Sequence, residues 1–315
     1  MDVSIIIVNY NSSEMVVDCI NSIYKHTSGV TYEVIVVDNA SEEGSLQVLK
    51  DNFGDGIKLI ESEVNLGFGK ANNLGAEKAE GEYLFLLNPD TLLLNNAVKI
   101  LCDYLEKNPE VGVAGGNLYS PDLAPTPSFC RTFDSIENEK KNSSWQKLIM
   151  SRVKTKLKIG SNKAMSEFNY KDIPEKVAYI FGADMMLKKS VFHKVGGFDR
   201  DFFMYGEEEE LTYRITQLSL NVMAVPEAKI IHLEGATLNA SHSFNARQFK
   251  MRMNGALTYF KKCFGDDGAE KFYFYRRRRY ERNMKIAKLM GKLTPESAAV
   301  LQLKYLDEAY KEFTE

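Results

Sequence analysis

Cysteine is scarce in this sequence, and its four copies lie far apart. Cys19, Cys102, Cys130 and Cys263 form no CxxC pair, which argues against a disulfide scaffold or a zinc ribbon and favours a reducing compartment. Long apolar runs are also lacking, since none approaches the ~20 residues that a membrane-spanning helix requires. No basic leader with a cleavage site precedes the first apolar run. These absences predict a cytoplasmic globular protein.

An excess of charge of one sign is also absent. The chain has 40 basic and 43 acidic side chains, and its formal net charge is −3. Such a balance argues against a protein that coats nucleic acid with its whole surface, although it leaves room for a local basic patch. With 315 residues and 44% apolar content, the chain is long enough for one large domain, with or without an appendage.

The first third of the chain alternates strand and helix patterns. Short β-branched runs alternate with segments whose apolar residues recur at helical spacing, and Ser12 or Ser13 is placed to cap the first helix. This alternation predicts an α/β fold with a mostly parallel sheet covered on both faces. The expected strands are Val3–Val8, Glu33–Val37, Lys58–Glu61, Tyr83–Leu87 and Val111–Gly115, and the expected helices are Met15–Tyr24, Asn72–Ala79 and Asn95–Lys107.

The pattern dissolves between about residues 120 and 176, where we expect a long surface excursion with one helix around Trp145–Lys156. Regular structure returns after it and becomes helical beyond Asn245. The later expected elements are a strand over Val177–Leu187 broken at Gly182, a helix over Glu208–Leu218, and two strands, Val222–Val225 and Lys229–Leu233.

Polar clusters follow three of the expected strands, at Asn9–Asn11, Asp38–Asn39 and Asn88–Asp90. Sheets of this class bind ligands beyond the carboxyl ends of their strands. The segment Gly67–Asn72 resembles a dinucleotide fingerprint, but it lacks the third glycine and does not open the first strand–helix unit. We therefore expect a ligand site at this edge of the sheet without a nicotinamide or flavin.

The acidic residues near this edge, and His232, could each have either a functional or a purely structural role. Asp90 could bind a divalent cation, or it could belong to a turn. Asp38 could cap a helix or bind a ribose or base, and His232 could ligate a metal or simply pack. The run Glu207–Glu210 could supply a general base, or it could only complement the dipole of the helix that it opens.

Taken together, these segments resemble the inverting glycosyltransferase family 2 of the GT-A fold, and within it the rhamnosyltransferase-like members. The match runs in order from residue 3 to about 265. The segments that carry it are Ser4–Asn11, Val36–Ser41, Asn65–Gly75, Leu86–Thr91, Gly182–Asp184, Gly196–Asp199 and Phe203–Glu208.

The resemblance implies roles for individual residues. Asn88 replaces the first aspartate of the DxD motif, and Asp90, with His232, would hold Mg²⁺ or Mn²⁺. Glu208 stands where the family has an aspartate base, with Glu207 as the alternative. The acceptor side would be formed by Gly182, Ala183 and Asp184. The nucleotide sugar would be bound by Val8, Tyr10, Asp38, Asn65, Lys70, Asn88 and Asp90.

The implied reaction is transfer of a sugar, with dTDP-rhamnose preferred over a UDP-sugar as donor, to a glycan or lipid-linked acceptor in surface polysaccharide synthesis. A Tyr10 ring stacked on thymine or uracil, with Asp38 accepting its N3–H, would suit those donors. Two other classes stay open: a metal-dependent nucleotidyltransferase, and a non-catalytic nucleotide-sugar-binding relic.

The chain is expected to divide into a catalytic domain, residues 1–265, and a helical extension, residues 266–315. Within the extension, Lys271–Lys292 carries nine basic residues and one acid, with aromatic residues interleaved. Such a helix could lie on the anionic inner face of a membrane, or it could pack on the catalytic domain or on a second copy in a homo-oligomer. Nucleic-acid binding is the least favoured partner.

Overall fold

The computed structural model describes residues 1–42, 44–144, 167–233 and 244–315. They form two compact units. The first holds the large sheet with helices α1 to α4, α8 and most of α9, and the second holds α5, α11, α12, α13 and the segment Met204–Glu207. The helix expected around residues 145–156 lies outside the described residues.

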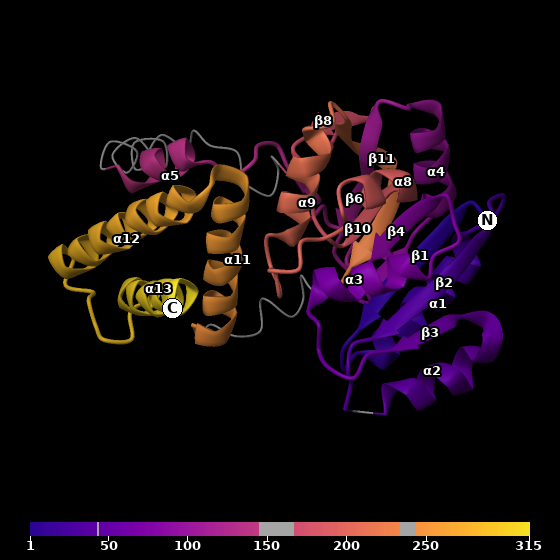
Figure 1. The fold of residues 1–315 in the computed structure, drawn as a ribbon, viewed down its shortest axis with the longest axis horizontal. Helices are drawn as coiled ribbons and strands as arrows, with labels where there is room; N and C mark the ends of the chain where they lie inside the picture. Colours follow the sequence, from indigo (N-terminus) through magenta and orange to yellow (C-terminus); the bar gives the residue numbers. More distant parts are fainter. Residues whose placement is uncertain (43, 145–166, 234–243) are drawn as a thin grey trace. The chain divides into compact units, whose positions relative to one another are not determined.

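A mixed sheet, nine-stranded within the described ranges, forms the centre of the first unit (Figure 1). Its order is β3-β2-β1-β4-β10-β6-β11-β5, and β8 pairs with β11 as well. The strands are β1 (Val3–Asn9), β2 (Tyr32–Asp38), β3 (Lys58–Glu61), β4 (Tyr83–Leu87), β5 (Thr91–Leu93), β6 (Val111–Tyr119), β8 (Glu175–Val177), β10 (Asp184–Lys188) and β11 (Asn221–His232).

Six of the nine described strands run in the same direction, as the alternating pattern predicts, and β5, β8 and β10 run against them. Strands β3, β2, β1 and β4 are parallel neighbours, and so are β6 and β11. Strand β10 is antiparallel to both of its neighbours, β4 and β6. The register pairs Asn9 of β1 with Asp38 of β2, which brings the polar ends of these two strands together.

Helices cover both faces of the sheet because successive residues of a strand point to opposite sides. Ile5 and Ile7 of β1 pack in one apolar cluster with α1 and α4, while Ile6 packs in another with α3 and α9. The helices of this unit are α1 (Ser13–His26), α2 (Ser45–Phe53), α3 (Phe68–Glu77), α4 (Ala97–Lys107), α8 (Lys189–Lys194) and α9 (Glu207–Thr216).

Several elements differ from the expectations. Helix α2 was not expected, because its mean hydropathy is near neutral and only Ser45 and Leu49 are buried. The two strands expected after residue 221 are one strand, β11, whose pairing with β6 shifts register between Ala224 and Lys229. A bulge keeps such a strand continuous through Pro226, which cannot donate a ladder hydrogen bond.

The start of the first helix also corrects an expectation. Ser12 is the N-cap residue of α1, but its side chain caps no helical N–H group. Its hydroxyl instead donates to Asn9 Oδ1 at 3.0 Å. The serine therefore ties the helix start to the end of β1.

Helices α11 (Ala246–Phe264), α12 (Asp266–Leu289) and α13 (Ala298–Thr314) pack together with α5 (Ile136–Ser143) in the second unit. Phe272 of α12 stacks on Phe260 of α11, with ring centroids 4.7 Å apart. The boundary expected at residue 265 does not coincide with the division between the units, because α11 belongs with α12 and α13. None of the described helices is both long and apolar enough to cross a membrane.

The basic segment Lys271–Lys292 has a packed side as well as an exposed one. Arg276 donates to both carboxylate oxygens of Glu139 on α5, at 2.9 and 2.7 Å, and the Glu139 side chain is only 4% exposed. Phe272 and Tyr280 are also buried. The side of α12 that carries Phe272, Arg276 and Tyr280 therefore packs against the rest of the chain, as one of the alternatives predicts. Arg276 is unavailable to any surface partner.

Candidate functional site

The loops that follow β1 and β2 are joined by a buried hydrogen-bond network. Asp38 is 2% exposed and Asn9 is fully buried. Asn9 Nδ2 donates to Asp38 Oδ1 at 2.7 Å, and the backbone N–H of Ser41 donates to Asp38 Oδ2 at 3.1 Å. Both carboxylate oxygens thus hold the protein's own loops, and a hydrogen bond donated by a nucleotide to Asp38 would use a remaining lone pair.

Asn39 extends this network to the loop before α3. Its side-chain N–H donates to Asn65 Oδ1 at 3.0 Å, and its Oδ1 accepts from Leu66 N at 2.8 Å. Gly67 has φ +80°, and a Cβ there would collide with the carbonyl oxygen of Phe203, so only glycine suits this turn. Sequence reasoning included Asn39 in the motif but gave it no role.

The side chains of Asp90 and His232 meet where β5 pairs with the end of β11. Strand β5 pairs antiparallel with β11, and the register sets His232 opposite Thr91. His232 Nε2 lies 3.3 Å from Asp90 Oδ2, and the two side chains are 19% and 17% exposed. The structure therefore brings together the two residues proposed as metal ligands, although they lie far apart in the sequence.

This pair fits a divalent cation. Two ligand atoms bound at ~2.1 Å and at right angles would lie ~3 Å apart, which is close to the observed separation. Within the described ranges no third histidine, cysteine, aspartate or glutamate joins them in a cluster. The remaining ligands would then come from the diphosphate and water, as is usual for Mg²⁺ bound with substrate phosphates.

Among the four glutamates that open α9, Glu208 is the accessible one. Glu207, Glu209 and Glu210 are 2%, 7% and 2% exposed, whereas Glu208 is half-buried. A Cβ added at Gly182 would lie 3.4 Å from the Phe68 ring and 3.9 Å from Glu208 Cβ. Gly182 therefore lies next to the Phe68 ring and to Glu208, and its acceptor-side role stays a prediction.

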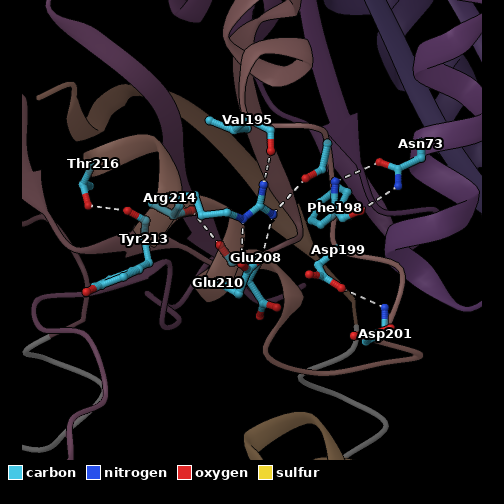
Figure 2. A network of polar contacts seen from close by, with 12 residues as sticks. Asn73, Val195, Phe198, Asp199, Asp201, Glu208, Glu210, Tyr213, Arg214 and Thr216 are labelled. Carbon is cyan, nitrogen blue, oxygen red and sulfur yellow. Dashed lines mark hydrogen bonds and ion pairs between the residues drawn. The ribbon is translucent and has the colours of Figure 1, made fainter. Parts of the chain in front are cut away.

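Arg214 fixes the loop that precedes this acidic turn (Figure 2). Its guanidinium donates to both carboxylate oxygens of Glu210 at 2.6 Å, and to the carbonyl oxygens of Val195 and Gly197 at 2.5 and 2.8 Å. On the other side of the loop, Asn73 of α3 exchanges two hydrogen bonds with the backbone of Phe198. Sequence reasoning missed this clamp, and its only sequence signal is the i,i+4 spacing of Glu210 and Arg214.

Arg214→Met should lower the free energy of unfolding by about 3 kcal/mol, because it leaves the buried Glu210 carboxylate without its counter-charge. Chemical denaturation would measure the change. Lys99→Met, which breaks an i,i+4 ion pair with Asp103 that is more than a third exposed, is the control and should cost under about 1 kcal/mol. Equal losses in both variants would contradict a buried clamp.

Asp184 does not face an open site, unlike the acceptor-side residue that the resemblance implies. It is fully buried in β10. Its Oδ2 accepts from Gly116 N at 2.5 Å, and its Oδ1 has no partner among the described residues. Burial raises the pKa of this carboxyl well above its ordinary value of 3.8 and so favours its protonated form.

Asp184→Asn should therefore stabilise the protein at pH 8. The folded state binds the proton more tightly than the unfolded state, so wild-type stability is fullest below pH 3.8 and falls as the pH rises towards the folded pKa. Each unit of that shift corresponds to about 1.4 kcal/mol. Unfolding midpoints of both proteins between pH 4 and 8 would measure a difference that widens with pH; a constant difference would contradict a neutral Asp184.

The other proposed nucleotide residues lie near the ends of β1 and β4 and at the start of α3, which begins earlier than the helix expected over Asn72–Ala79. Val8 is in β1, Tyr10 follows it with 46% of its surface exposed, and Lys70 is half-buried in the first turn of α3. Asn88 follows β4, and its backbone N–H donates to Ala183 O at 3.0 Å. A stacking role for Tyr10 and a phosphate role for Lys70 stay predictions.

Comparison with known proteins identifies relatives among the glycosyltransferases. The chain is 28% identical over 243 residues to the low-salt glycan biosynthesis hexosyltransferase Agl10 of Haloferax volcanii, covering 73% of this chain and 67% of that protein. It is 24% identical over 210 residues to an N-acetylglucosaminyl-diphospho-decaprenol L-rhamnosyltransferase of Mycobacterium tuberculosis, covering 63% of this chain and 66% of that one. The matched part thus spans about two thirds of these relatives.

Solved structures of other transferases share the fold. The mannosyltransferase PcManGT of Pyrobaculum calidifontis, solved with GDP-Man and Mn²⁺, superposes with a TM-score of 0.57 at 14% identity, over 99% of this chain and 86% of that one. GalNAc-T7, solved with UDP, GalNAc and Mn²⁺, superposes with a TM-score of 0.61 at 17% identity, over 98% of this chain and 54% of that one.

The fold is thus that of the GT-A glycosyltransferases. Residues 4–196 match the family described as glycosyl transferase family 2, and residues 162–235 match the one described as N-terminal domain of galactosyltransferase. The chain belongs to glycosyl transferase family 2.

Proposed function

We propose that this glycosyltransferase moves a sugar from a nucleoside diphosphate to an acceptor hydroxyl with inversion at the anomeric carbon, and that it requires a divalent cation. The observation that carries the proposal is the Asp90–His232 pair, 3.3 Å apart at the sheet edge. These two residues would hold the cation, which would supply electrostatic stabilisation of the departing diphosphate.

Glu208 would act as the general base of this reaction. It is the most accessible acid of the Glu207–Glu210 run and lies beside Gly182. The carboxylate would take the proton of the acceptor hydroxyl while the hydroxyl oxygen attacks the anomeric carbon from the face opposite the diphosphate. The carbon–oxygen bond to the diphosphate breaks as the new glycosidic bond forms, and this in-line geometry inverts the centre.

The proposed donor is a thymidine or uridine diphosphate sugar, with dTDP-rhamnose placed first. The rhamnosyltransferase named above supports the sugar. The two solved neighbours hold UDP and GDP-Man, so they support a nucleoside diphosphate without distinguishing its base. The proposed acceptor is a glycan or lipid-linked sugar of a surface polysaccharide. Contact of the Lys271–Lys292 segment with the inner membrane surface would suit such an acceptor.

A donor-hydrolysis assay tests the proposal. We expect release of the nucleoside diphosphate from dTDP-rhamnose or a UDP-sugar only when Mg²⁺ or Mn²⁺ is present. Release of pyrophosphate would identify a nucleotidyltransferase instead, and binding without release would identify a relic. Thermal denaturation with dTDP, UDP and GDP would identify the base, because a ligand at 100 times its Kd adds about 2.7 kcal/mol of stability.

A further inference from the structure

A basic pocket of about 280 Å³ lies on the second unit, where α12 passes the end of α5. It is formed within that unit and does not include the residues of the proposed transfer site. Its lining residues are Ser143, Phe274, Arg277, Arg278, Glu281, Arg282 and Lys285.

The pocket holds four cations and one carboxylate, and the carboxylate is already engaged. Arg277 donates to Glu281, and its Nε also donates to Asp307 Oδ1 at 3.1 Å. Within the described ranges, neither Arg278 nor Lys285 has an acidic partner, and both side chains are exposed. The wall of the pocket is therefore electropositive after its internal ion pairs are formed.

Arg282 is the buried member of the set, with 7% of its surface exposed. It donates to the carbonyl oxygens of Asn142 and Ser144 at 2.9 and 2.5 Å, but no carboxylate of the described residues contacts it. Its Nε has no hydrogen-bond partner among the described residues. Burial, and then Arg279, lower the pKa of this guanidinium. A buried cation without a counter-charge is costly, and an anion in the pocket would remove that cost.

Apolar side chains lie along the same stripe of α12 as these cations. Phe274 lines the pocket and is 54% exposed, and Leu289, fifteen residues further along, is 83% exposed. Helical periodicity places Phe274, Arg278, Lys285 and Leu289 within one face about 22 Å long. Cations between exposed apolar residues are typical of helices that lie in the interface of an anionic bilayer.

We propose that this pocket binds the phosphate of an anionic lipid headgroup and so holds α12 at the bilayer surface. Guanidinium groups suit this ligand because they offer paired N–H donors to phosphate oxygens. This inference rests on the proposed function, in which the acceptor is lipid-linked. It specifies the contact that would hold the protein at the membrane. The membrane-contacting surface expected from Lys271–Lys292 is also corrected, because Arg276 pairs with Glu139 and does not contact the bilayer.

Vesicle co-sedimentation of the full chain tests the site. Wild-type protein should bind phosphatidylcholine vesicles containing phosphatidate more tightly than vesicles containing phosphatidylserine at matched surface potential. The variant R278Q/K285Q removes two cations, each of which contributes about 1 kcal/mol of attraction near an anionic surface. Its partition to phosphatidate vesicles should therefore be about thirtyfold weaker than that of the wild type. The matched control is K304Q/K311Q, which removes the same charge from α13 of the same unit, outside the pocket lining; it should change partition less than threefold.

Other results would overturn the proposal. Equal losses in the two double variants, or no preference for phosphatidate, would indicate diffuse attraction rather than a phosphate site. Stabilisation by inorganic phosphate or pyrophosphate without vesicle binding would identify a soluble ligand, and tighter binding to a single-stranded oligonucleotide would identify nucleic acid. Donor hydrolysis measured without vesicles should be unchanged in R278Q/K285Q, so failure of this site and failure of the proposed transfer reaction remain distinguishable.

Discussion

Glu208→Gln is expected to lower kcat for sugar transfer by about 10²–10⁴-fold, the usual contribution of a general base. The amide has the same shape as the carboxylate but cannot accept the hydroxyl proton. Donor binding should be retained, because the base acts on the acceptor. Single-turnover transfer with saturating donor, together with calorimetric titration of the nucleoside diphosphate, would measure both quantities.

Glu207→Gln is the matched control for this experiment. Glu207 is adjacent in the sequence and chemically identical, but it is 2% exposed at the start of α9. We expect Glu207→Gln to retain most of its turnover. The reverse result, with Glu208→Gln active and Glu207→Gln inactive at unchanged stability, would assign the base to Glu207.

Asp90→Asn is expected to reduce turnover by about 10²–10³-fold, the loss that follows removal of one preorganised electrostatic contact to developing charge. It should also weaken Mn²⁺ binding in the presence of nucleoside diphosphate, since a neutral amide replaces one of two adjacent protein ligands. Electron paramagnetic resonance of free Mn²⁺ measures this binding independently of catalysis.

Asp103→Asn supplies a control with the same chemical change. Asp103 lies on α4 in an ion pair with Lys99 and is 35% exposed. It should leave Mn²⁺ affinity and turnover unchanged. Unaltered Mn²⁺ affinity in Asp90→Asn would remove the cation from this position and leave Asp90 and His232 as an ordinary ion pair.

Much of the fold could be predicted because the strands of a covered sheet are continuous apolar runs. Runs such as Tyr83–Leu87 end at polar residues, so both the strand and its ligand-facing end are visible in the sequence. Helix α2 is short, and only its Ser45 and Leu49 are buried; it was not expected from the sequence. The start of α3 at Phe68 rather than Asn72 depends on the left-handed turn at Gly67, which propensity alone does not predict.

The candidate site was predictable only in part, because burial decides what each polar side chain does. Asp38 and Asp184 look alike in sequence, as acids next to apolar strands, yet Asp38 is held by Asn9 and Ser41 whereas Asp184 is enclosed beside Gly116. Glu208 differs from its neighbours by exposure, which depends on the helix phase of α9. The clamp by Arg214 joins its helix to a loop, and local sequence patterns cannot indicate that contact.

The pairing of β5 with β11 has a consequence for how the chain folds during its synthesis. Asp90 leaves the ribosome early, but its partner His232 belongs to the last strand of the sheet, and β10 must first insert between β4 and β6. Such distant pairings make folding slow. On the emerging chain, the Asn9–Asp38 network can therefore form well before Asp90 and His232 are brought together.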